Sequence, residues 1–481
     1  MPMPKIYGFI LILAIMVACK APLDSDSQAP KSKALPTAYM MKGDSLSSKA
    51  LPWRRFFSFD STLSSLIDSA LRNNLDLKIA MQRVEMARSQ VVLTKGIRAP
   101  DLSVGLGTGI RRIGKYTMDG VGNYDTKFSP NLNSKQTIPD PLSDFTIGFQ
   151  SNWEIDVWGK LKSKKTAALN RFLSSENGRN LVLSNLVSEV ATAYFELRAM
   201  DYELIVLREN LVLQQNALDI VIVQKETELA TELGVEIMQA QLLSSKEKEV
   251  QIIQWIIESE NVLSMLLGQF PNPISRKGNF LSDSTPILLP IGIPSDLLRQ
   301  RPDILQAEND IRAAKADVAS ARTAFYPSLN LGTSLGYQAF SAALLLENPA
   351  SMVYNAIGGI TAPLLNRRVI KAQLLNAKAE QQQAYFKYQK TIILAFTEVY
   401  NSVKQIENFG KRSDLKREEV AVLRNAIGTS SDLFRTARAN YLEVVNAQKN
   451  ALMSQLELAE LKKLQFKAVV DLYIALGGGW R

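Results

Sequence analysis

Residues 144–165 read DFTIGFQSNWEIDVWGKLKSKK, and the rest of the chain is organised around this stretch. Up to position 157, large apolar side chains occupy one parity except at Ser151, while threonine, glycine, amides and carboxylates occupy the other. This alternation predicts a β-strand with one apolar and one polar face. A soluble sheet would explain it, but about ten residues with a lipid face and a wet face favour a transmembrane strand. The apolar side chains are Phe145, Ile147, Phe149, Trp153, Ile155 and Val157.

Three further segments alternate in the same way, and long helical patterns separate them. The predicted strands are 101–112, 145–157, 328–338 and 354–364. Apolar residues at spacings of three and four predict helices at 63–92, 160–229, 234–268, 301–325, 369–435 and 441–476, with possible irregularity near Gly410 and Gly428. A helix of about 70 residues is about 100 Å long. The core of a soluble domain needs nothing of that length.

The two halves of the chain repeat each other. Each half reads helix, strand, loop, strand, very long helix and shorter helix, which predicts an internal two-fold repeat. The matching pairs are Gln239-Ala240-Gln241 with Asn446-Ala447-Gln448, Leu267-Gly268 with Leu476-Gly477, and Trp158-Gly159-Lys160 with Asn366-Arg367-Arg368.

The chain begins with an apolar run, residues 6–17, that follows Lys5 and precedes Ala18-Cys19. The run is too short for a membrane-spanning helix and fits the core of a signal peptide. Residues 16–19, MVAC, resemble a bacterial lipoprotein box, which implies cleavage before Cys19 and covalent acyl chains on that residue. An ordinary cysteine behind a signal peptide is the alternative.

Composition argues against several classes of function. The chain has 481 residues, a net charge of +9, one cysteine and no histidine. The commonest general base and metal ligand is therefore missing, and no disulfide can form within the chain. We expect no enzyme activity, no cofactor and no metal site. No basic run is interleaved with aromatic residues, so nucleic-acid binding is not expected either.

Four strands cannot close a barrel, because single-chain barrels begin at eight. Open strand edges are not tolerated in hydrocarbon, so several chains must share one barrel. The expected fold is mainly α with transmembrane β: a long coiled α-helical barrel, plus four strands per chain in a shared β-barrel, which would have 12 strands if it were trimeric. Helix lengths suggest that 441–476 stacks end to end with 63–92, and 234–268 with 301–325. A coiled-coil lipoprotein with a few soluble strands is the alternative.

These elements divide the chain into segments, and the two long hairpins have their tips near 230–234 and 437–441. The expected segments are a lipoprotein signal peptide (1–18), a lipidated N-terminal tether (19–60), the first repeat (61–268), a connector in the equatorial region (269–300), the second repeat (301–477) and a C-terminal tail (478–481).

The junctions between strands and helices are aromatic and basic. Such residues are typical of a membrane–water interface and of contact with anionic headgroups. Generic surface charge and core aromatics are the alternative. The candidate membrane-interface residues are Trp153, Trp158, Phe325, Tyr326, Lys160, Arg367 and Arg368.

Taken together, the motifs resemble the outer membrane efflux family of the TolC/OprM type, and especially its lipoprotein branch associated with resistance-nodulation-division (RND) pumps. The motifs are WEIDVWGK at 153–160, RPDI at 301–304 with Ala307-Glu308, FYP at 325–327, YLEVVNAQ at 441–448 and LGGGW at 476–480. The resemblance implies a homotrimer anchored by lipid in the bacterial outer membrane, with its helical part in the periplasm. It also implies a periplasmic membrane-fusion adaptor and an inner-membrane RND-type pump as partners.

The resemblance further implies a tunnel gate at the periplasmic tip, formed by a ring of leucine and a ring of carboxylate. These positions correspond to Leu442 and Asn446, so an amide replaces the carboxylate here, and Lys449 stands where a tip arginine is common. Coiled-coil packing is the alternative role for Leu442. The expected adaptor contacts are Ala230, Thr231, Glu232, Leu233, Gly234, Arg438, Ala439, Asn440 and Tyr441.

The function expected from the resemblance is a passive outer-membrane exit duct of a tripartite efflux system. Its cargo would be small molecules such as drugs or other toxic compounds. Type I protein secretion is an alternative within transport, and a structural envelope lipoprotein or adhesin is the alternative from another class.

Overall fold

The computed structural model describes residues 36, 52–276, 280–282, 294–363, 365–436 and 438–480. The predicted signal peptide and Cys19 lie outside these residues. Among the described residues, no helix combines the length and the apolar composition that crossing a membrane requires. The chain divides into two compact units: Met86–Phe172 with Asp310–Tyr385, and Leu173–Asn309 with 52–85 and 386–480.

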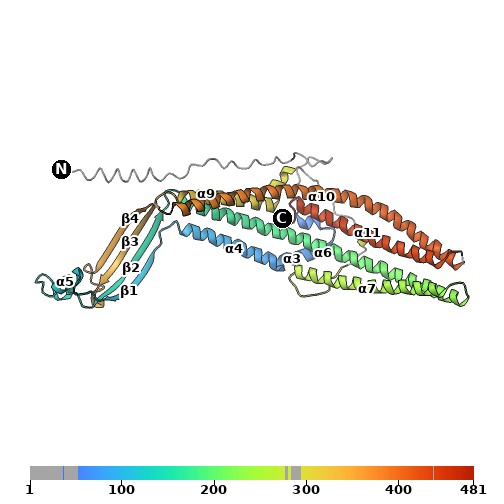
Figure 1. The fold of residues 1–481 in the computed structure, drawn as a ribbon, viewed down its shortest axis with the longest axis horizontal. Coiled ribbons are helices and arrows are strands. Elements are labelled where there is room, and N and C mark those ends of the chain that lie inside the picture. Colours follow the sequence, from blue (N-terminus) through green and yellow to red (C-terminus); the bar gives the residue numbers. More distant parts are fainter. Residues whose placement is uncertain are drawn as a thin grey trace. The chain divides into compact units, whose positions relative to one another are not determined.

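The first unit contains a four-stranded antiparallel sheet (Figure 1). Its strands are β1 (Ser103–Arg111), β2 (Leu142–Ile155), β3 (Ser328–Ala339) and β4 (Met352–Thr361), and they lie in sequence order. The register places Val104, Phe149, Leu335 and Tyr354 in one row across the sheet. One face is therefore apolar from edge to edge, and Tyr354 on it is 78% exposed.

Two strands end two or three residues earlier than the alternation predicts, and both ends have local causes. β2 stops at Ile155 rather than 157, because the carboxylate of Asp156 accepts hydrogen bonds from the backbone N–H groups of Leu161 (2.9 Å) and Lys162 (2.7 Å) and so caps the next helix. β4 stops at Thr361 rather than 364, where Pro363 follows and cannot donate to the ladder.

The long helices are α6 (Lys160–Glu226, 67 residues) and α10 (Arg367–Arg435, 69 residues). The irregularity predicted near Gly410 and Gly428 is absent, since α10 runs through both positions. One glycine costs a helix only about 1 kcal/mol relative to alanine, which the neighbouring turns of so long a helix can absorb. The shorter partners are α7 (Glu232–Leu266) and α11 (Tyr441–Ala475).

The helix predicted at 63–92 is wrong as a single element, because the structure has α3 (Ser61–Asn73) and α4 (Leu75–Gly96). Asn74 separates them with an extended ψ of 132°. Its side-chain oxygen accepts a hydrogen bond from Leu77 N (2.9 Å) at the start of α4, and its amide donates to Leu266 O (2.9 Å) at the end of α7. One buried side chain thus joins the end of one helix to the start of another.

Arg301 makes the corresponding junction in the second half. It precedes α9 (Pro302–Thr323) and donates to Ala475 O (3.1 Å) at the end of α11, and it also pairs with Asp303 (2.8 Å) and Glu398 (2.7 Å). Burial acts to lower the pKa of Arg301, but the hydrogen bonds and charges of these two carboxylates raise it overall.

The predicted end-to-end pairing of the short helices is therefore wrong. α7 ends against the start of α4, and α11 ends against the start of α9. A glycine with positive φ follows each helix and permits the close approach. A Cβ at Gly268 (φ 66°) would lie 2.5 Å from Asn73 O, and one at Gly477 (φ 88°) would lie 2.8 Å from Gln300 O.

The second unit is held by aromatic packing among α2 (Trp53–Phe56), α6 and α11. The ring of Phe56 stacks on Tyr473 with centroids 4.0 Å apart, and Phe195 stacks on Phe466 at 4.4 Å. The remaining short elements are α5 (Met118–Asp125), α8 (Leu297–Gln300) and 3-10 turns at Ser134–Gln136, Phe280–Ser282, Pro294–Asp296 and Ala342–Leu344.

Replacing Arg301 with glutamine should lower the free energy of unfolding by about 2 kcal/mol, because Asp303 and the α11 carbonyl lose a charged donor in a buried setting. Thermal unfolding of the detergent-extracted protein, followed by circular dichroism, measures the change. Arg299→Gln is the matched control, since Arg299 lies two positions away and is exposed. Equal destabilisation by both variants would contradict the role given to Arg301.

Candidate functional site

The two long helical hairpins reverse at similar turns, which lie between α6 and α7 and between α10 and α11. Thr231 caps α7, where its hydroxyl accepts a hydrogen bond from Gly234 N (3.2 Å), and Asn440 caps α11 in the same way through Leu442 N (3.4 Å). Lys225 and Glu232 form an ion pair across the first turn. Capped ends and short turns fix where each tip lies relative to its own hairpin.

A buried cluster holds the two tips together within the second unit. The ring of Tyr441 covers Gly234 so closely that a Cβ at that glycine would lie 3.1 Å from it. Gln448 adds a hydrogen bond to Leu213 O (3.4 Å) on α6. The core of this cluster is Ala217, Leu218, Val221, Met238, Leu242, Phe434 and Val444.

The predicted gate residues lie on the opposite face of α11. Leu442, Asn446 and Lys449 are all exposed, with Leu442 at 42%, while Val444 and Gln448 point into the cluster. Spacings of four and three residues place the three exposed side chains on one stripe of the helix. This stripe is free to line a space outside the single chain, and its role as a gate stays a prediction.

The predicted adaptor contacts divide into two groups. Thr231, Glu232, Leu233, Arg438 and Asn440 are exposed, whereas Ala230 and Ala439 are half-buried. Gly234 is buried under the half-buried Tyr441, so these two residues mainly contact each other. No short-range sequence pattern connects positions so far apart, which is why their contact could not be foreseen.

The aromatic residues of the predicted interface gather where β2 gives way to α6. Trp158 stacks on Tyr326 with centroids 5.1 Å apart and donates its indole N–H to Pro327 O (2.7 Å). Trp153 donates to Arg98 O (3.0 Å), and Phe325 is half-buried beside Tyr326. These contacts anchor the strand ends to one another within the first unit.

The basic residues of the predicted interface occupy the first turns of α6 and α10. Lys160 pairs with Glu154 at 2.8 Å, while Arg367 and Arg368 are exposed. Neither first turn contains an acidic residue. The start of a helix is itself positive, but Asp156 caps α6 and Glu154 pairs with Lys160, so part of the positive charge is offset at the start of α6. Among the described residues, no group of three or more carboxylate or thiol ligands is placed to hold a metal ion.

Comparison with known proteins gives consistent matches over nearly the whole chain. The family model described as "Outer membrane efflux protein" matches residues 66–269 and 293–478. The chain is 29% identical over 483 residues to the cation efflux system protein CusC of Escherichia coli O6:H1, covering 99% of both chains. It is 30% identical over 457 residues to the solvent efflux pump outer membrane protein SrpC of Pseudomonas putida, covering 94% of this chain and 93% of that protein.

A solved structure of CusC superposes with a TM-score of 0.80. It is 27% identical and covers 95% of this chain and 100% of that one. The sheet, the paired long helices and the sequence motifs thus lead to one conclusion: the chain belongs to the outer membrane efflux protein family.

Proposed function

We propose that three copies of this chain form a passive exit duct, in which twelve strands make one β-barrel in the outer membrane and the long helices make a periplasmic tube. One observation carries the proposal. The sheet has an apolar, exposed face across all four strands, yet β1 and β4 are open edges among the described residues.

An open edge in hydrocarbon leaves backbone N–H and C=O groups without partners, at several kcal/mol each. Pairing of the edge strands with those of further copies of the chain removes this cost. Successive strands are antiparallel, so β1 and β4 run in opposite directions. β4 of one copy can therefore continue the antiparallel ladder onto β1 of the next, and a ring of three copies leaves no edge.

The helices support the tube by their length and their repeated junctions. α6 has 67 residues and would extend about 100 Å. Asn74 with Gly268, and Arg301 with Gly477, make similar end-to-end junctions in the two halves. We take these as support for an internal two-fold repeat, in which two pairs of short helices lie beside two long ones.

At the membrane, the proposed anchor is a set of acyl chains on Cys19, with the tether leading to the first repeat. The basic turns at Lys160, Arg367 and Arg368 would meet periplasmic headgroups. At the far tips, Leu442 and Asn446 from three copies would close the tunnel. A periplasmic adaptor that prefers splayed tips would open it by shifting the population between the two states.

Energy for transport would come from an inner-membrane pump of the RND type, since the duct itself is passive. The proposed cargo is small toxic molecules. The names of the two relatives specify cations for CusC and solvents for SrpC, at almost equal identity to this chain. Because relatives with such different cargoes are about equally similar to this chain, we assign the choice of cargo to the pump.

The test measures the mass of the detergent-extracted protein and its conductance in planar bilayers. We expect a trimer that forms channels, and a strain lacking the gene that becomes sensitive to small toxic compounds. A monomer without channel activity would contradict the proposal and favour a structural lipoprotein or adhesin. A trimeric channel whose loss abolishes secretion of a protein, with no change in sensitivity, would favour type I secretion.

A further inference from the structure

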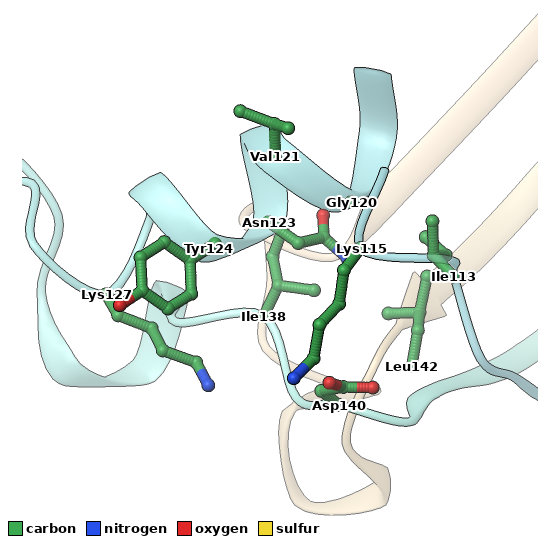
Figure 2. Close-up of a pocket in the computed structure, with 10 residues that line it drawn as sticks. All are labelled: Ile113, Lys115, Gly120, Val121, Asn123, Tyr124, Lys127, Ile138, Asp140 and Leu142. Carbon is green, nitrogen blue, oxygen red and sulfur yellow. The ribbon is translucent and has the colours of Figure 1, made fainter. Parts of the chain in front are cut away.

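The connection between β1 and β2 contains a cavity of about 280 Å³ at the strand ends that are remote from the start of α6 (Figures 1 and 2). The wall includes apolar side chains from Ile113, Val121, Ile138 and Leu142, and two ammonium groups. The proposed function places these strand ends at the cell surface, because the helices occupy the other ends. The position of the cavity at the cell surface therefore rests on the proposed function.

The cavity has a fixed wall. Thr117 caps α5 through Gly120 N (3.1 Å), and α5 lies so close to the preceding segment that a Cβ at Gly120 would lie 2.9 Å from the carbonyl carbon of Gly114. Further along the β1–β2 connection, Lys135 pairs with Glu347 (2.8 Å) in the β3–β4 connection. The β1–β2 connection is therefore fixed at two points, at α5 and at Lys135.

The outer surface of the β1–β2 connection is unusually apolar for a loop. Tyr116, Met118, Tyr124 and Phe128 are all exposed, and the rings of Tyr124 and Phe128 lie 5.1 Å apart. Exposed apolar side chains gathered in one place mark an interaction surface. Aromatic rings beside lysines are typical of the headgroup level of a membrane.

The charge of the cavity is positive. Lys115 and Lys127 line it together with one carboxylate, Asp140, so its net charge is +1. In Figure 2 both lysine side chains run downward in the view, Lys127 toward the right and Lys115 toward the left. Neither side chain forms a hydrogen bond or ion pair with another described residue, whereas Arg111 at the end of β1 pairs with Asp119, and Lys135 pairs with Glu347.

We propose that this cavity binds the phosphate group of an outer-leaflet lipid, with Lys115 and Lys127 on the phosphate and the apolar wall against the adjoining part of the lipid. Lysine is a natural point-charge partner for phosphate. A lipid would contact both the lysines and the apolar wall of the cavity. A free phosphate dianion would contact only the lysines, and the carboxylate of Asp140 would repel it.

The test uses native mass spectrometry of the detergent-extracted protein with bisphosphorylated lipid A as the probe. We expect lipid A adducts on the trimer, and a reduction of about tenfold or more in the variant Lys115→Gln/Lys127→Gln, since two charge-assisted contacts are lost. Arg112→Gln removes a positive charge from the same connection outside the cavity and, in contrast to Lys115→Gln alone, should retain the adducts. Lys115→Arg/Lys127→Arg keeps the charge and should also retain them.

Three outcomes would overturn the proposal: equal adducts on all variants, equal binding of lipid A that lacks phosphate, or displacement of lipid A by millimolar inorganic phosphate. The last would assign the site to free phosphate. The same spectra report the oligomer, so a monomer would contradict the proposed function, whereas a trimer without adducts would contradict the lipid site. Persistence of the trimer peak in each variant shows that the loop substitutions leave assembly intact.

Discussion

Channels in which Leu442 is replaced by alanine should pass several-fold more current in planar bilayers than native channels. Leu442 is 42% exposed in the single chain, although it lies beside the buried tip cluster. In a trimer, three such side chains would converge on the tunnel axis and form an apolar constriction that excludes water. Alanine removes most of each side chain and leaves the helix intact.

The control is the same substitution on the other hairpin, Leu233→Ala, which changes an exposed leucine in the first turn of α7. Its conductance should stay at the native value, because the proposed gate uses α11. If Leu442→Ala leaves the current unchanged, the residue packs between helices and does not gate. If both variants raise the current equally, general loosening of the tips explains the effect and the gate assignment fails.

The strands were largely predictable because apolar and polar side chains alternate along each of them. Where one face meets lipid and the other meets water, each step along the strand alternates between apolar and polar. The row from Val104 to Tyr354 therefore could be placed on one face before its register was known. The lengths of α6 and α10 were predictable for a related reason, since proline is absent from both long patterns.

The junctions between helices were not predictable, because they depend on contacts between distant residues. Asn74 lies within apolar spacing that continues on both sides, and its bonds to the nearby Leu77 N and the distant Leu266 O together account for the break there. Helix lengths permitted two ways of stacking the short helices, and length cannot distinguish them. Gly268 and Gly477 allow the close approach at each junction. In the sequence, however, a glycine after a helix indicates only where that helix ends, not which helix lies next to it.

The cavity beside α5 was missed for a different reason. Residues 112–141 are rich in glycine, asparagine and proline, a composition that predicts an irregular loop. Thr117 followed by Met118-Asp119 is a weak helix start on its own, and the short helix depends on close packing of Gly120 against Gly114. The composition therefore predicts a loop here but not the cavity that it contains.

Replacing Gly336 with valine should sharply lower the amount of assembled trimer in the outer membrane. Gly336 lies opposite Gly148 in the β2–β3 ladder, in a row that continues to Gly105 on β1. A Cβ at Gly336 would lie 2.5 Å from the Cα of Gly148, and backbone in a ladder cannot move aside as a side chain can. Overpacking typically costs about 1–3 kcal/mol, and here it also disturbs the curvature that closure of a barrel needs.

Unheated gel electrophoresis of outer-membrane extracts measures the trimer directly, and we expect its band to fall at least about tenfold, in line with a cost of about 1.4 kcal/mol or more. Gly332→Val is the matched control, because Gly332 lies on the same central strand but a Cβ there would meet no atom closer than 3.5 Å. It should keep native trimer levels. Native levels in Gly336→Val would mean that the two strands can separate without harm, which a sealed barrel in lipid does not allow.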